Sequence, residues 1–114
     1  MAGTMTNEAQ RRYWEKRIDR FDAIYDDNHG LREWTLLSRW VEPLRRGSLQ
    51  KRFDLTVGFL QDAGIEGKCF VDAGCGTGRL TEFLLQEKAC FVMANDITRR
   101  ALTLARQRIE DHDR

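Results

Sequence analysis

Apolar residues recur every three or four positions through the first sixty residues, and this period predicts helices rather than strands. A first helix is expected over residues 7–25. Its apolar stripe would consist of Trp14, Ile18, Phe21 and Tyr25. A second helix is expected over residues 31–41. Pro43 and Gly47 should end it, because proline lacks a backbone donor and clashes with the preceding turn.

A third helix is expected over residues 48–62, with Ala63-Gly64 after it. Its inward-facing positions would be Leu49, Phe53, Val57 and Leu60. From residue 67 the pattern changes to two short apolar runs, each followed by an acidic residue and then a helical pattern. Strands that alternate with helices in this way predict an α/β fold with parallel strands.

The first apolar run is Cys69–Val71, which ends at Asp72, and the second is Cys90–Ala94, which ends at Asn95-Asp96. A helix with Leu80, Phe83 and Leu84 inward should separate them. The last helix should begin near Thr98, which is a favourable N-cap residue, and run at least to Ile109. Its buried stripe would be Ala101, Leu102, Ala105 and Ile109, and the charged residues 110–114 look frayed.

Residues 71–78 read Val-Asp-Ala-Gly-Cys-Gly-Thr-Gly and carry most of the candidate chemistry. Glycine accepts positive φ and lets the backbone approach a ligand closely, so this turn indicates a cofactor site. The dinucleotide pattern G-x-G-x-x-G would require glycine where Arg79 stands. The phosphate-loop pattern also fails, because no Lys-Ser/Thr pair follows Gly78.

Asp96 lies 24 residues after Asp72, about one strand–helix–strand unit later. Parallel strands place their carboxyl ends side by side, so both acids and the glycine turn should converge on one edge of the sheet. A carboxylate there can accept two hydrogen bonds from a ribose diol, at roughly 1.5–3 kcal/mol each. Two plainer interpretations remain: a simple strand-to-helix turn, and an acid favoured by the dipole of the next helix.

Residues 71–78 resemble the first motif of class I S-adenosylmethionine-dependent methyltransferases, and Asp96 matches the acid that ends their second strand. The resemblance covers roughly residues 67–109. It implies that the glycine turn lies against the methionine part of S-adenosylmethionine. It also implies that the acid binds both ribose hydroxyls and that the next residue packs on the adenine. The cofactor-binding residues so implied are Asp72, Gly74, Cys75, Gly76, Gly78, Asp96 and Ile97.

The resemblance implies an α/β fold class: the N-terminal part of a doubly wound, Rossmann-like methyltransferase fold. A helical N-terminal lid would precede two parallel strands and their helices. The expected segments are a disordered start or tag (1–6), a helical N-terminal cap (7–66) and the cofactor-binding half of the domain (67–114).

Residues 21–25 (Phe-Asp-Ala-Ile-Tyr) are similar to the lid of the small-molecule branch, which includes quinone-biosynthesis and magnesium-protoporphyrin methyltransferases. Tyr13 and Tyr25 are therefore candidate lid residues. The alternative is ordinary packing of amphipathic helices. His29 is a weak candidate base, and no catalytic residue is identified.

The net charge of +1 argues against a dedicated nucleic-acid binder, although residues 39–52 are locally basic. That stretch is either a solvated helix face or a patch for an acidic substrate. The three cysteines lack metal-ligand spacing, so no metal or disulfide is expected, and free, mostly buried thiols suggest the cytoplasm. No apolar run reaches the length of a membrane span.

The sequence contains only two strands, whereas the family's sheet has more. A fragment, a truncated reading frame, and a chain that completes its sheet with a partner chain or a second copy are the competing explanations. The leading functional hypothesis is the S-adenosylmethionine-binding part of a methyltransferase that acts on a small molecule. The alternative is a non-catalytic module that binds or regulates a partner chain. A nucleotide-dependent dehydrogenase is disfavoured by Arg79.

Overall fold

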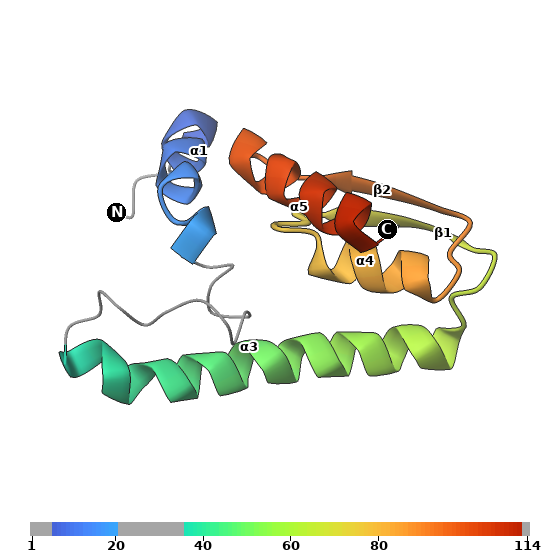
Figure 1. The fold of residues 1–114 in the computed structure, drawn as a ribbon, viewed down its shortest axis with the longest axis horizontal. Helices are drawn as coiled ribbons and strands as arrows, with labels where there is room; N and C mark the ends of the chain where they lie inside the picture. The colour runs from blue at the N-terminus through green and yellow to red at the C-terminus, as the bar shows by residue number, and fades with distance from the viewer. Residues whose placement is uncertain (1–5, 21–35, 113–114) are drawn as a thin grey trace. The chain divides into compact units, whose positions relative to one another are not determined.

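The structure, a computed structural model, describes residues 6–20 and 36–112, and the side chains of residues 6–20 and 47–111. Its elements follow the order helix, helix, strand, helix, strand, helix (Figure 1). They are α1 (Asn7–Glu15), α3 (Leu36–Ala63), β1 (Cys69–Ala73), α4 (Arg79–Gln86), β2 (Phe91–Asn95) and α5 (Arg99–His112). Residues group into two compact units: Met1–Arg20 with Ile65–Arg114, and Phe21–Gly64. Each unit is described by itself.

β1 and β2 form a parallel pair in which Val71 lies opposite Met93 and Asp72 lies opposite Ala94. The strands alternate in burial because successive side chains point to opposite faces. The Asp72 face is covered, whereas Val71, Phe91 and Met93 on the other face are 67%, 55% and 53% exposed. The predicted parallel α/β arrangement is therefore confirmed.

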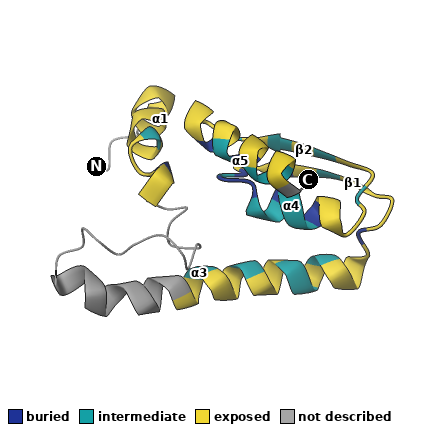
Figure 2. Ribbon diagram, viewed as in Figure 1, coloured by how far each residue is buried: buried dark blue, intermediate teal, exposed yellow. Residues whose placement is uncertain are grey.

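α4 and α5 pack against each other, and α4 also packs on β2. Their buried residues are Thr81 and Leu84 of α4, and Ala101 and Ala105 of α5. Figure 2 shows buried positions on both helices. Leu102 was expected in the same stripe but is 38% exposed, because it lies one position beyond the narrow Ala101–Ala105 face. α5 continues regularly to His112, so the expected fraying from residue 110 is wrong over residues 110–112.

Thr98 begins α5 as predicted, since its hydroxyl accepts a hydrogen bond from the Ala101 amide at 3.2 Å. α1 ends earlier than the expected helix over 7–25, with a turn at residues 16–17 before residues 18–20 become helical again. Ile18 is buried but Trp14 is 39% exposed, so the predicted stripe is only partly buried. Phe21 and Tyr25 lie outside the described residues.

The predicted helix break at Pro43 and Gly47 is wrong, since α3 runs without interruption from Leu36 to Ala63. Proline costs about 3 kcal/mol and glycine about 1 kcal/mol in a helix interior, but local propensity is a weak guide because most helical stability in proteins comes from packing of one face. The predicted inward positions of its second half are all half-buried, namely Leu49, Phe53, Val57 and Leu60. Within the described part of the chain, no helix has the length and apolarity that a bilayer crossing needs.

Candidate cofactor site

The glycine turn between β1 and α4 has the conformation that its sequence requires. Gly74, Gly76 and Gly78 have φ values of 74°, 54° and 83°, a region that other residues rarely adopt. Gly78 is also constrained by space, because a Cβ added there would lie 2.7 Å from the Cβ of Ala105 in α5. The turn therefore depends on glycine for its backbone and, at position 78, for its contact with α5.

The end of β2 holds this turn through three consecutive amides. The Gly74 amide donates to Oδ1 of Asn95 at 3.1 Å, and the Cys75 amide donates to the Asn95 carbonyl at 2.8 Å. The Gly76 amide donates to Oδ2 of Asp96 at 3.0 Å. The predicted convergence of the glycine turn and Asp96 on one sheet edge is therefore confirmed.

These bonds have a consequence for ligand choice. Phosphate-binding loops present free backbone N–H groups to the anion. Here the Gly74, Cys75 and Gly76 amides are already engaged by the end of β2, and the Gly78 amide donates to the Cys75 carbonyl at 3.0 Å. The turn is thus poorly suited to a phosphate, in agreement with the failure of both phosphate-type spacings.

Asp96 joins the turn to the start of α5. Its Oδ1 accepts hydrogen bonds from the amide and the hydroxyl of Thr98, at 2.9 and 3.1 Å, and its Oδ2 accepts from Gly76. A carboxylate offers about four acceptor positions, so one position on Oδ2 remains for a ligand. Contact with both ribose hydroxyls, which stays a prediction, would require one of these internal bonds to move.

Asp72 is buried on the covered face of β1 and accepts a hydrogen bond from the Thr81 hydroxyl at 2.6 Å. Thr81 lies in the first turn of α4 and is only 2% exposed. The pair therefore ties the strand to the helix that follows the glycine turn. Direct contact of Asp72 with a ligand stays a prediction.

Two carboxylates, those of Asp72 and Asp96, lie close enough to Cys75 to affect its thiol, whereas the Arg108 guanidinium contacts the turn at Thr77. Burial, followed by the charges of Asp72 and Asp96, raises the pKa of the Cys75 thiol to about 11. The two carboxylates disfavour a further anion beside Cys75, and the Cys75 thiol stays neutral at physiological pH. Cys69 and Cys90 are exposed, so the expectation of mostly buried thiols is wrong: Cys69 is the first residue of β1, and Cys90 directly precedes β2.

Around this centre, Ile97 follows Asp96 and is 41% exposed, which leaves it accessible to a ligand ring. Tyr13 is 42% exposed and stacks edge-on against Trp14, with their ring centroids 5.4 Å apart. α1 docks near the site, since Oε1 of Glu15 accepts a hydrogen bond from the Arg99 amide at 3.0 Å. The lid roles of Tyr13 and Tyr25 stay predictions, and Tyr25 and His29 lie outside the described residues.

Sequence reasoning missed two polar side chains that hold this site, Asn95 and Thr81. Asn95 directly precedes the predicted acid, so its place at a strand end was the available signal. Thr81 lies in a helix, where threonine carries no distinctive pattern. Among the described His, Cys, Asp and Glu side chains, no group of three is arranged to hold a metal ion.

Comparison with known proteins agrees with this geometry. Residues 70–114 match the family model of a methyltransferase domain. No curated protein matches the chain in a sequence comparison. One similar solved structure is the magnesium protoporphyrin IX methyltransferase of Synechocystis PCC 6803 with bound S-adenosylmethionine. It is 27% identical with a TM-score of 0.75, over 97% of this chain and 50% of that one.

The same enzyme with bound S-adenosylhomocysteine is 24% identical with a TM-score of 0.68, over 93% of this chain and 45% of that one. The chain therefore spans about half the length of the structures that it matches. The resemblance seen in the sequence is confirmed. The chain has the N-terminal part of a class I S-adenosylmethionine-dependent methyltransferase fold, with two parallel strands and their helices.

Proposed function

We propose that this chain, which has the N-terminal part of a class I methyltransferase fold, is the S-adenosylmethionine-binding part of a methyltransferase that acts on a small molecule. The carrying observation is the hydrogen bond from the Gly76 amide to Asp96, which unites the glycine turn and the acid in one site. The carboxylates of Asp72 and Asp96 beside Cys75 support a sulfonium cofactor, and the engaged amides of the turn disfavour a phosphate-bearing one.

The proposed roles follow from position. Gly74–Gly78 would lie against the methionine part, Asp96 would bind the ribose through Oδ2, and Ile97 would contact the adenine. Asp72 would support the turn from the β1 side. When bound, S-adenosylmethionine supplies a methyl group on a positively charged sulfur. The residues of this chain would hold that group in a fixed orientation, which is the main requirement of in-line transfer.

The Synechocystis protein that this chain resembles is a porphyrin methyltransferase, and this likeness supports a small-molecule acceptor. We also propose a cytoplasmic location, supported by the free thiols of Cys69 and Cys90, because exposed thiols persist in a reducing compartment.

Calorimetric titration with S-adenosylhomocysteine tests the proposal. The folded chain should bind it, and Asp96→Ala should weaken binding about 10- to 100-fold, which corresponds to one charge-assisted hydrogen bond. Asp111→Ala removes an exposed acid of α5 and is the matched control, which should bind normally. Absence of binding by a folded sample, or equal affinities of the Asp96 and Asp111 variants, would contradict the proposal.

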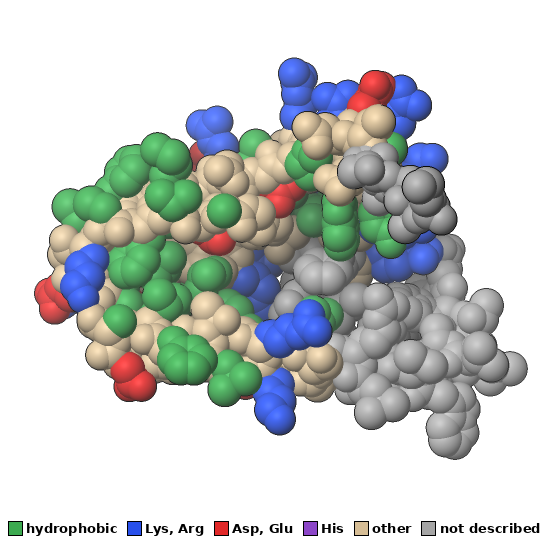
Figure 3. Space-filling view, turned by 180° about the vertical axis from the view of Figure 1, so that it is seen from behind, with side chains coloured by type: hydrophobic (Ala, Val, Ile, Leu, Met, Phe, Trp, Pro, Cys, Tyr) green, Lys and Arg blue, Asp and Glu red, His purple; other side chains and the backbone are tan. Residues whose placement is uncertain are grey.

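The second candidate function is a methyltransferase-like module that binds a partner chain or a second copy. The observation that favours it is the exposed apolar sheet face formed by Val71, Phe91 and Met93. Figure 3 shows hydrophobic side chains gathered over this part of the molecule. Light scattering with and without S-adenosylhomocysteine separates the candidates. A stable oligomer that does not respond to the ligand supports the module and contradicts the cofactor-binding function.

A further inference from the structure

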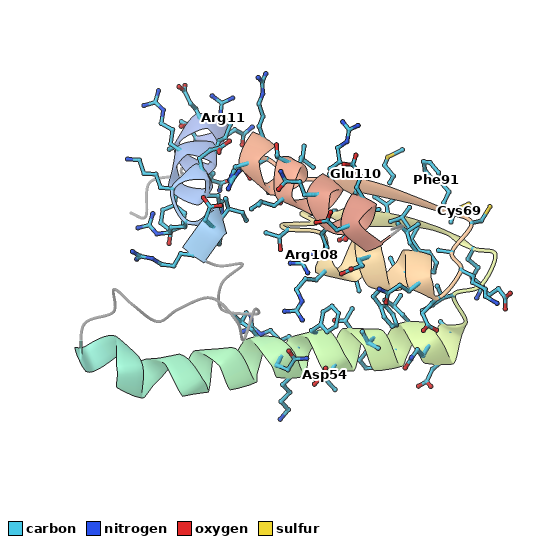
Figure 4. The ribbon with its side chains drawn as sticks, viewed as in Figure 1. Arg11, Asp54, Cys69, Phe91, Arg108 and Glu110 are labelled. Atoms are coloured by element: carbon cyan, nitrogen blue, oxygen red, sulfur yellow. The ribbon has the colours of Figure 1, made fainter. Side chains whose placement is uncertain are left out.

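Contacts from α5 converge on the second half of the glycine turn. Nε of Arg108 donates a hydrogen bond to the Thr77 carbonyl at 3.0 Å, across 31 residues of sequence. Its Nη1 lies 3.7 Å from Oε2 of Glu82 in α4, and these two side chains are only 25% and 19% exposed. Arg108 extends from α5 in Figure 4. One turn earlier, Ala105 closes against Gly78.

The Thr77–Gly78 peptide is held at both of its polar groups. Its carbonyl accepts from Arg108, and its N–H donates to the Cys75 carbonyl at 3.0 Å. Gly76 and Gly78 flank Thr77, and glycine is the residue with the greatest backbone freedom. Rotation of this peptide would change the backbone of the turn, and the charge-assisted bond from Arg108 opposes that rotation.

We propose that Arg108 is a positioning residue for the cofactor turn, acting through the Thr77 carbonyl and supported by Glu82. The inference rests on the proposed function, because it assumes that this turn binds the cofactor. A turn that is already ordered loses less conformational entropy when a ligand binds. Ligand affinity should consequently depend on Arg108 even though its side chain acts on the turn and not on the ligand.

Two variants of the same helix test this role. Arg108→Met should weaken S-adenosylhomocysteine binding about 5- to 30-fold, less than a full charge-assisted hydrogen bond, because the lost bond orders the turn and does not contact the ligand. Arg106→Met removes the same charge from an arginine that is 81% exposed and paired with Glu110, and it should leave affinity unchanged. Arg108→Lys restores a cationic donor and should recover at least half of the loss on a logarithmic scale. Glu82→Gln keeps the bond to Thr77 and should weaken binding less than Arg108→Met.

Equal affinities of Arg108→Met and Arg106→Met, within twofold, would overturn the inference. Ligand binding that is weakened equally by Arg108→Lys and Arg108→Met would also overturn it, since a cationic donor at position 108 would then not matter. If Arg108→Met does not fold, NMR of the unmodified chain decides. Nε–H of Arg108 should exchange with solvent at least about tenfold more slowly than Nε–H of an arginine in an unstructured peptide, and equal rates would refute the bond. A folded, unmodified chain that binds no ligand contradicts the proposed function instead, and the exchange comparison still decides the inference.

Discussion

At the scale of single residues, the site is defined by which acceptor each backbone amide meets. Asp96 was predictable as a site residue, because it ends an apolar run about one strand–helix–strand unit after Asp72, and that pattern is specific. The role of Asn95 was not, since an asparagine at a strand end is also typical of an ordinary turn. Only the structure shows that its side chain accepts from Gly74.

Gly78 provides the first prediction, because it combines positive φ with a close approach to Ala105. Gly78→Ala should lower the free energy of unfolding by about 2–4 kcal/mol, the sum of backbone strain and overpacking. Gly67→Ala is the matched control, because Gly67 has φ of 72° but nothing within 4 Å of an added Cβ. That variant should lose only about 1–2 kcal/mol. Urea unfolding measures both, and equal losses would show that the Ala105 contact is unimportant.

Cys75 provides a prediction about pH. Its folded pKa of about 11 lies above the ordinary value of 9.0, so the folded state holds the thiol proton more tightly than the unfolded state. The resulting stabilisation is complete below pH 9 and is lost as the pH rises through 11. Cys75→Ala should remove this part of the alkaline decline in unfolding free energy. An identical pH profile between 9 and 11 would contradict the assignment.

The same thiol should react slowly. At pH 8, iodoacetamide should modify the exposed Cys69 and Cys90 well before Cys75, because the thiolate is the reactive form and Cys75 is buried. Mass spectrometry of peptides after timed labelling measures the three rates. Equal labelling of Cys75 and Cys90 would show that the turn opens readily in solution.

At the scale of elements, the junction between β2 and α5 combines helix capping with site geometry. The Thr98 hydroxyl accepts from the Ala101 amide and donates to Asp96, and Thr98 is fully buried. The cap was predictable from residue type, whereas its bond to the candidate ribose acid required the structure. One residue therefore starts the helix and orients the acid.

Thr98→Ala should consequently reduce both stability and ligand binding. Loss of an N-cap costs about 1 kcal/mol, and Asp96 would lose one of its three internal hydrogen bonds. Thr103→Ala removes an exposed hydroxyl of the same helix, which bonds only to the Arg99 carbonyl, and should change stability by less than about 0.5 kcal/mol. Thermal unfolding measures the stability of both variants, and titration with S-adenosylhomocysteine measures their ligand affinity. If Thr98→Ala bound the ligand with normal affinity, Thr98 would cap the helix without orienting Asp96 for binding.

At the scale of the whole chain, sequence reasoning found the elements that have local signals. The parallel strands, the glycine turn and the last helix follow from period and spacing over short windows. The predictions that failed, and the contacts that were missed, depend on residues far apart in the sequence or on local effects that offset one another. α3 continues through Pro43. The hydrogen bonds that Arg108 donates to Thr77 and that the Arg99 amide donates to Glu15 span 31 and 84 residues. Contacts that distant leave no pattern in a single sequence.

The apolar sheet face gives the last prediction, because Val71, Phe91 and Met93 form adjacent exposed positions on two paired strands. An apolar face of this kind favours association, which burial of the face would stabilise. Light scattering of the isolated chain should therefore give a mass that rises with concentration. Met93→Glu should reduce this rise, since a charge resists burial. Leu55→Glu is the control: Leu55 is equally exposed, at 54%, but lies on α3. A single-chain mass at every concentration, or equal effects of the two variants, would show that this sheet face drives no association.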